Sequence, residues 1–137
     1  MPITTVFNET LQLEKGEFLV QIVTEQAEID LPFLCVKKRR QWDVGYPLVT
    51  AAALKKNEQI KLAFSGLCSF PFRAEQMEES INAKLLTKEE RIEEAIQRIP
   101  APVLNDLHGS AEYRLFVLKN TLSDVLDALG GEQHVKS

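Results

Sequence analysis

Residues 110–131, SAEYRLFVLKNTLSDVLDALGG, hold the longest amphipathic pattern in the chain. Apolar side chains recur there at steps of three and four residues, which places them on one stripe of an α-helix. Ser110 is suited to cap the amino end through its hydroxyl, and Gly130 with Gly131 to end the helix in a left-handed turn. The pattern predicts a helix that covers a sheet with this stripe: Leu115, Leu118, Leu122, Val125, Leu126 and Leu129.

Two shorter helices are expected just before it. Thr87-Lys88-Glu89-Glu90 has the spacing of a capping box, in which the Thr87 hydroxyl and the Glu90 carboxylate each satisfy a backbone amide of the first turn. The helix that it opens should stop before Pro100, with one apolar face made of Ile92, Ala95, Ile96 and Ile99. A further short helix is predicted over residues 74–83.

The first half of the chain has the patterns of strands. Residues 58–65, EQIKLAFS, alternate between apolar and polar side chains, which is typical of a half-buried strand. Residues 48–54, LVTAAAL, form a strand or, because alanine favours helices, a helix. With a polar turn at 55–58, a hairpin over 48–65 is the favoured arrangement. Residues 17–24 and 33–37 are also rich in β-branched and aromatic side chains, which predicts two more strands.

Strands followed by helices indicate an α+β fold: a mostly antiparallel sheet covered on one face by the C-terminal helices. At 137 residues we expect a single domain spanning residues 1–137.

The composition excludes several classes of protein. A hydrophobic content of 45% and a charged content of 26% are ordinary for a globular domain. The net charge of −4 argues against nucleic-acid binding. No apolar run is long enough to span a membrane, and the first residues lack the layout of a signal peptide. We therefore expect a soluble, cytoplasmic protein.

The chain shows no self-contained active site. Cys35 and Cys68 lie in apolar stretches and are expected to be buried, reduced thiols. The two histidines, His108 and His134, are far apart, so no zinc-type ligand set is expected. The motifs of phosphate loops, serine hydrolases and zinc proteases do not occur. We therefore predict no catalytic residues and no metal site.

Four segments, in order, resemble one family. LEKGEFLVQI (13–22) resembles an L-x-x-G-E-x-L-x-x-I strand entry, and 33–53 resembles an F-x-K…R-R-x-x-D-I-A segment followed by a strand of small residues. Residues 60–81 resemble an alternating strand, Gly, then P-x-R-A…E, and 104–122 resemble D-x-x-G-S-x-x-Y-R. Together they resemble the C-terminal domain of the FAD-binding (medium) subunit of molybdenum hydroxylases, the family of xanthine dehydrogenase and carbon monoxide dehydrogenase flavoprotein.

The resemblance implies a part of an enzyme. In that family electrons pass from a molybdopterin subunit through an iron–sulfur subunit to FAD, and an N-terminal FAD-binding domain holds most of the flavin. That domain is absent from this chain, so we expect no turnover and weak or no FAD binding by the chain alone. The expected partners are the FAD-binding N-terminal domain or subunit and the molybdopterin and iron–sulfur subunits. The alternative is a non-enzymatic interaction or dimerisation module on the same scaffold.

The resemblance also suggests cofactor-binding residues. Lys37 or Lys38 would lie near the flavin, where a cation stabilises the negative charge of the reduced ring. Counting back from Arg39 and Arg40 without a gap places the family's lysine at Cys35, so the assignment to Lys37 or Lys38 requires a shorter loop. The alternative for both lysines is a solvated basic rim. Leu19 matches an apolar flavin contact, with a core strand position as its alternative.

Further residues of the matched segments have other expected roles. Arg39, Arg40 and Asp43 could form a cluster at a domain contact, next to Trp42, which departs from the family pattern. Tyr113 and Arg114 are expected to be structural. Tyr113 would pack under the sheet, and Arg114 would tie down a loop or bind Glu78 and Glu79.

Overall fold

The computed structural model describes residues 1–39 and 48–130. By its internal contacts the chain divides into two compact units, Met1–Leu31 and Pro32–Ser137. The expectation of one domain over residues 1–137 stays a prediction. No helix among the described residues has the length and apolarity needed to cross a membrane.

The first unit is short and open. It contains a 3-10 turn, η1 (Ile3–Thr5), a pair of two-residue antiparallel strands, β1 (Phe7–Asn8) and β2 (Thr10–Leu11), and one helical turn, α1 (Gln26–Ile29). Every side chain in this unit is exposed or only partly buried. The unit therefore has no hydrophobic core of its own.

The predicted strand over residues 17–24 is wrong for this structure. These residues have no regular secondary structure, although their side chains suit a strand. A strand is stable only when its backbone groups pair with a neighbour, and residues 17–24 make no ladder with another described residue. Local preference for β structure was therefore not enough.

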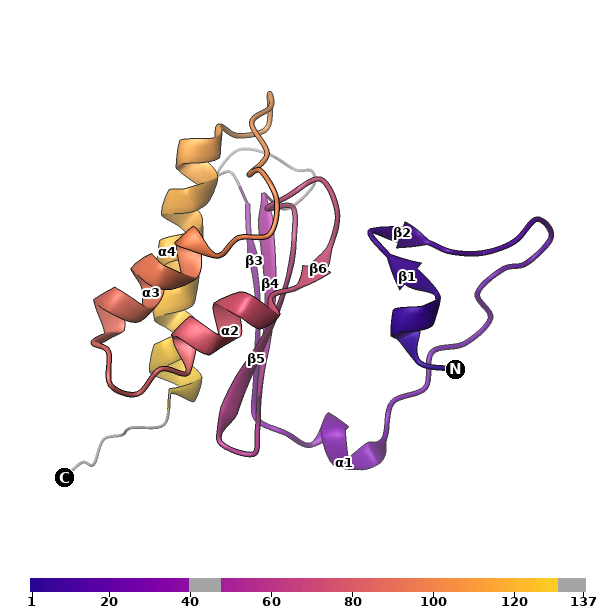
Figure 1. Ribbon diagram of the computed structural model, residues 1–137, viewed down its shortest axis with the longest axis horizontal. Coiled ribbons are helices and arrows are strands. Elements are labelled where there is room, and N and C mark those ends of the chain that lie inside the picture. Colours follow the sequence, from indigo (N-terminus) through magenta and orange to yellow (C-terminus); the bar gives the residue numbers. More distant parts are fainter. Residues whose placement is uncertain (40–47, 131–137) are drawn as a thin grey trace. The chain divides into compact units, whose positions relative to one another are not determined.

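The second unit holds a four-stranded antiparallel sheet with the order β3-β4-β5-β6. Figure 1 shows the three helices on one side of this sheet, where α4 contacts β3 and β4, α2 contacts β5, and α3 packs on α2 and α4. This confirms the predicted α+β fold class. The bounds are β3 (Phe33–Lys38), β4 (Val49–Lys56), β5 (Gln59–Ser65), β6 (Phe72–Arg73), α2 (Glu75–Ile81), α3 (Lys88–Gln97) and α4 (Ala111–Leu129).

The hairpin predicted over residues 48–65 is confirmed, and residues 49–56 are a strand rather than a helix. Asn57 and Glu58 form its two-residue turn, and both have positive φ angles, 52° and 63°. Two successive positive φ angles are the geometry of a turn that matches the twist of a hairpin. The sheet-forming alternation therefore outweighs the helix preference of the three alanines.

The helices begin where their caps predict. The Thr87 hydroxyl accepts from the Glu90 amide at 3.2 Å, and the Glu90 carboxylate accepts from the Thr87 amide at 2.8 Å. At α4 the Ser110 hydroxyl accepts from the Tyr113 amide at 3.1 Å. The predicted left-handed C-cap is wrong at Gly130, which has a right-handed φ of −59°. Gly131 lies outside the described residues.

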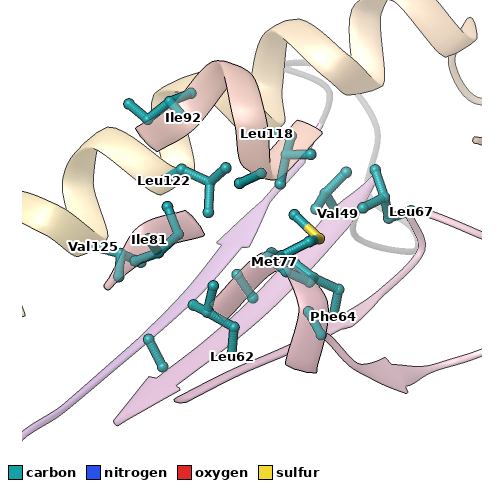
Figure 2. Close-up of a cluster of buried hydrophobic side chains, with 14 of the residues drawn as sticks. Val49, Leu62, Phe64, Leu67, Met77, Ile81, Ile92, Leu118, Leu122 and Val125 are labelled. Carbon is teal, nitrogen blue, oxygen red and sulfur yellow. The ribbon is translucent and has the colours of Figure 1, made fainter. Parts of the chain in front are cut away.

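The core of the second unit lies between the sheet and the helices (Figure 2). Alternate residues of β4 and β5 point into it, and α4 contributes the apolar stripe predicted from its spacing, with Leu115 partly buried at its margin. The side chains labelled in Figure 2 are Val49, Leu62, Phe64, Leu67, Met77, Ile81, Ile92, Leu118, Leu122 and Val125.

Only one of the two cysteines is buried as predicted. Cys68 lies in the core, its thiol donates to the Ala101 carbonyl at 3.4 Å, and burial raises its pKa. Cys35 is exposed, which corrects the expectation. An apolar stretch of sequence does not specify which face of a strand each residue occupies, and Cys35 lies on the face of β3 away from the helices.

Candidate functional site

The face of the sheet opposite the helices is uncovered within the second unit, and we call it the open sheet face. Successive strand residues point to opposite sides, so this face takes the residues that alternate with the core positions. Most of its central side chains are small. Its members are Phe33, Cys35, Lys37, Thr50, Ala52, Leu54, Lys56, Gln59, Lys61, Ala63, Ser65 and Arg73.

Lys37 lies on the open sheet face near the end of β3. Its partner in the adjacent strand is Thr50, which in turn pairs with Ser65, so the lysine stands beside two short polar side chains. Lys37 is exposed. The position offers an ammonium group at the margin of a partly apolar surface.

Lys38 points to the other side of the strand. Its Nζ lies 3.4 Å from Oδ2 of Asp124 on α4, and both side chains are about half exposed. The two lysines predicted as alternatives for one role therefore lie on opposite faces of β3. Of these two lysines, Lys37 is therefore the one on the open sheet face, and Lys38 is paired with Asp124 on the helix side.

Cys35, which the ungapped alignment places at the family's lysine, lies two residues before Lys37 on the same face. Its neighbours across the sheet are Ala52 and Ala63. Cys35 and Lys37 therefore both lie on the open sheet face, whereas Lys38 does not.

Leu19 belongs to the first compact unit and is 43% exposed. It is not a core strand residue, because residues 17–24 form no strand. Its assignment to a flavin contact stays a prediction. Arg39 is exposed, whereas Arg40, Asp43 and Trp42 lie outside the described residues, so the predicted cluster stays untested.

Arg114 fixes the end of the sheet where β3 stops and β4 begins. The residue is 3% exposed, and one guanidinium nitrogen donates to two carbonyls, of Leu48 at 2.7 Å and Gly66 at 2.6 Å. A second nitrogen donates to Oδ1 of Asp106 at 2.8 Å, and the third donates to the Gly109 carbonyl at 3.3 Å. The prediction that Arg114 ties down a loop is confirmed.

Leu48 links Arg114 to the end of β3, where Lys37 and Lys38 lie. The Leu48 amide donates to the Lys38 carbonyl at 2.7 Å, while the Leu48 carbonyl accepts from Arg114. Gly66 approaches the same carbonyl so closely that a Cβ would lie 2.5 Å from its oxygen, and its φ of +80° also favours glycine. The residue types of this cluster were visible in the sequence, but their convergence depends on long-range packing.

Asp106 is the anionic partner in this cluster. The hydrogen bond from Arg114, together with backbone donors at His108 and Gly109, lowers the pKa of its carboxyl group below the usual value. A carboxylate held in this way stays charged down to more acidic pH. The cluster is therefore a structural ion pair.

Two other predicted roles around α4 and α2 need correction. Tyr113 does not pack under the sheet: it is 42% exposed and stacks on Phe116, with ring centroids 6.4 Å apart. Its position on the helix lies outside the core-facing stripe. Glu78 binds Arg73 rather than Arg114, with Nε to Oε1 at 3.1 Å, and also accepts from the Leu62 amide at 2.8 Å.

Known structures share this fold. The reconstituted CO dehydrogenase from Oligotropha carboxidovorans matches with a TM-score of 0.57 and 19% identity, over 74% of this chain and 37% of that chain. Quinoline 2-oxidoreductase from Pseudomonas putida 86 matches with a TM-score of 0.57 and 21% identity, over 77% of this chain and 39% of that chain. CO dehydrogenase from Hydrogenophaga pseudoflava matches with a TM-score of 0.53 and 20% identity, over 72% of this chain and 37% of that chain.

The chain thus spans less than two fifths of the length of each of these proteins. No curated protein matches its sequence. Residues 34–129, most of the second unit, match the family described as CO dehydrogenase flavoprotein C-terminal domain. The resemblance is confirmed for the three later segments, whereas the first, 13–22, lies outside the match, and the chain belongs to the CO dehydrogenase flavoprotein C-terminal domain family.

Proposed function

We propose that this chain is the C-terminal part of the FAD-binding subunit of a molybdenum-hydroxylase-type oxidoreductase. Its role is to complete a flavin site whose other side belongs to an FAD-binding domain. Family membership supports this role, as does the chain's span of under two fifths of the matched proteins. Electrons would reach the flavin from molybdopterin and iron–sulfur subunits, and the chain would have no turnover by itself.

The open sheet face is the observation that carries the proposal. An exposed sheet face with alanines at its centre allows another body to approach the backbone closely, because Ala52 and Ala63 project little beyond the pleat. Lys37 stands at its margin. We infer that the FAD-binding domain and the flavin lie against this face.

Lys37 supplies the charge that such a site needs. An ammonium group near the flavin stabilises the anionic reduced ring by a Coulomb attraction that grows as water is excluded. Lys38 would contribute less, because its ammonium group is paired with Asp124 on the helix side. Leu19 would supply an apolar contact from the first unit.

Calorimetric titration of the full chain with FAD tests whether the chain alone lacks most of the flavin site. We expect weak or no binding, because the phosphates and most of the flavin would be held by the other domain. Nanomolar affinity for the chain alone would contradict the proposal.

The role of Lys37 in the flavin site is tested in the complex with the FAD-binding domain of the same subunit, produced as a separate chain. Lys37→Ala should make the flavin midpoint potential more negative, because the reduced anion loses a nearby cation. Lys61→Ala is the matched control, since Lys61 lies on the same face two strands away, and should leave the potential unchanged. Equal potentials for wild type and Lys37→Ala would remove Lys37 from the site.

A further inference from the structure

The outer edge of β3 forms no ladder with another described strand. β3 stands at the end of the strand order β3-β4-β5-β6 and pairs with β4 on one side only. The opposite edge of the sheet is different, because β6 pairs with β5, and the side chains of Glu78 and Asn82 bind further backbone groups of β5. An unpaired edge presents a row of backbone donors and acceptors to which another strand can add.

The ladder with β4 determines which backbone groups of β3 point outward. The Lys55 amide donates to the Pro32 carbonyl at 2.9 Å, so these two residues form a hydrogen-bonded pair. Such pairs alternate along an antiparallel ladder, which makes Leu34 and Val36 the next residues that bond to β4. The residues between them direct their amides and carbonyls to the outer edge, where no described strand accepts them: Phe33, Cys35 and Lys37.

The side chains give this edge an apolar end and a basic end. Phe33 is 71% exposed at the start of β3, whereas Lys37 and Lys38 close the strand. Lys37 lies on the open sheet face with Phe33, and Lys38 lies on the helix side, where Asp124 already balances its charge. Like charges directly opposite each other destabilise a ladder. A strand that adds here should therefore place an apolar side chain, and not a cation, opposite Lys37.

We propose that β3 pairs in antiparallel fashion with β3 of a second copy of this chain, about a two-fold axis at Cys35. In this register Cys35 lies opposite its own copy, and Phe33 lies opposite Lys37 of the partner subunit. All the outward amides and carbonyls then join hydrogen-bonded pairs, because the same residues point outward in both copies. Each phenylalanine ring meets the stem and ammonium group of a lysine, which is a favourable contact. Parallel pairing would instead set lysine against lysine.

This dimer is independent of the proposed function. The outward backbone groups lie in the plane of the sheet, so pairing through them joins two sheets edge to edge and leaves the open sheet face uncovered. The contact consists of one six-residue strand from each copy. An interface of this small size is weak, so we expect a reversible dimer whose population rises with protein concentration.

Light scattering of the full chain at increasing concentration measures the association. We expect the mass to rise from 15.5 kDa towards that of a dimer. Cys35→Pro removes an outward amide but no hydrogen bond between β3 and β4, so it should weaken the dimer about tenfold while thermal unfolding stays cooperative. Cys35→Ala keeps the amide and is the matched control. A wild-type chain that stays monomeric, or a proline variant that dimerises as well as the alanine variant, would overturn the proposal.

Two substitutions at Phe33 test the register without changing the backbone. Phe33→Lys sets a cation opposite Lys37 of the partner subunit and should weaken the dimer, whereas Phe33→Glu sets an anion there and should preserve it. Light scattering under the same conditions compares the two variants. Equal dimerisation of both would contradict the antiparallel register.

The Cys35 thiols report the same register by cross-linking. Residues of a hydrogen-bonded pair have Cα atoms about 5.5 Å apart, within the range of roughly 4.4–6.8 Å that disulfides span. Diamide, which takes up one electron and one proton from each thiol, should therefore link two copies through Cys35, while the buried Cys68 should not react.

The control for the cross-link moves the thiol along β3. Phe33→Cys combined with Cys35→Ala places the two thiols four residues apart along the ladder, about 14 Å, and should give no linked dimer. Linkage at position 33 as fast as at position 35 would overturn the two-fold axis at Cys35.

Discussion

At the scale of single residues, Arg114 joins several segments of the second unit. It is a buried cation whose partners are three carbonyls and one carboxylate, drawn from the start of β4, the end of β5 and the loop before α4. A buried guanidinium is tolerated only when its donors are used, and here all three nitrogens have acceptors.

Arg114→Met should therefore be strongly destabilising. It leaves the Leu48 and Gly66 carbonyls without this donor, and a buried acceptor left unsatisfied costs about 1–3 kcal/mol. Urea unfolding followed by circular dichroism measures the change.

Arg98→Met is the matched control. Arg98 pairs with Glu79 at 2.9 Å, but both side chains are largely exposed, so its loss should cost less than about 1 kcal/mol. Equal losses for the two variants would show that the buried cluster contributes no more than a surface pair.

The sequence shows that Arg114 is structural but not what it binds. Its place in the SAEYR string gives its position on α4, whereas the Leu48 and Gly66 carbonyls are 66 and 48 residues away along the chain. The same limit applies to Lys37 and Lys38. Alternation along β3 puts them on opposite faces, but only the position of α4 decides which one finds an acidic partner.

At the scale of elements, α2 covers the outer edge of β5. The Asn82 side chain accepts from the Ile60 amide and donates to the Ile60 carbonyl, both at 2.9 Å, and Glu78 accepts from the Leu62 amide. These side chains replace a neighbouring strand, so a short β6 is sufficient. An edge satisfied in this way is protected against pairing with other chains.

The capping box predicts the effect of one hydroxyl on α3. Thr87→Ala removes the acceptor for the Glu90 amide and should cost about 1 kcal/mol of stability, within the usual range for lost N-caps. Thr87→Ser keeps the hydroxyl and serves as the control. Thermal unfolding compares them, and an alanine variant as stable as wild type would show that water replaces the cap at no cost.

Helices and strands could be predicted from the sequence where the residues that pair with them or cap them are close neighbours in the chain. The 48–65 hairpin pairs with itself through a two-residue turn, and α3 and α4 carry their own caps. The segment over residues 17–24 has an equally clear strand pattern, but its partner is not among the described residues. Local preference identifies a strand former, and only tertiary structure supplies the ladder.

At the scale of the whole molecule, the two units differ in how they are stabilised. The second has a contiguous core under its sheet, whereas no residue of the first is fully buried. The hydrophobic stabilisation that can be assigned from the described residues therefore lies in residues 32–130.

Removal of residues 1–31 should leave the second unit folded. We expect residues 32–137 to unfold cooperatively, with a melting temperature within a few degrees of that of the full chain, as followed by circular dichroism. Loss of cooperative unfolding on truncation would show that the first unit supplies contacts on which the core depends.

The Leu48 backbone is hydrogen-bonded at both its amide and its carbonyl, which affects how proteins with this domain can diverge. Its amide donates to the Lys38 carbonyl at the end of β3 and its carbonyl accepts from Arg114, so Lys38 and Leu48 are fixed to each other and to α4. Insertions or deletions between residues 39 and 47 can then accumulate without shifting the pairing of β3 with β4. The number of residues between these two anchors can thus vary while the scaffold stays constant, and sequence alignments across this stretch will misplace the lysines at the end of β3, Lys37 and Lys38, first.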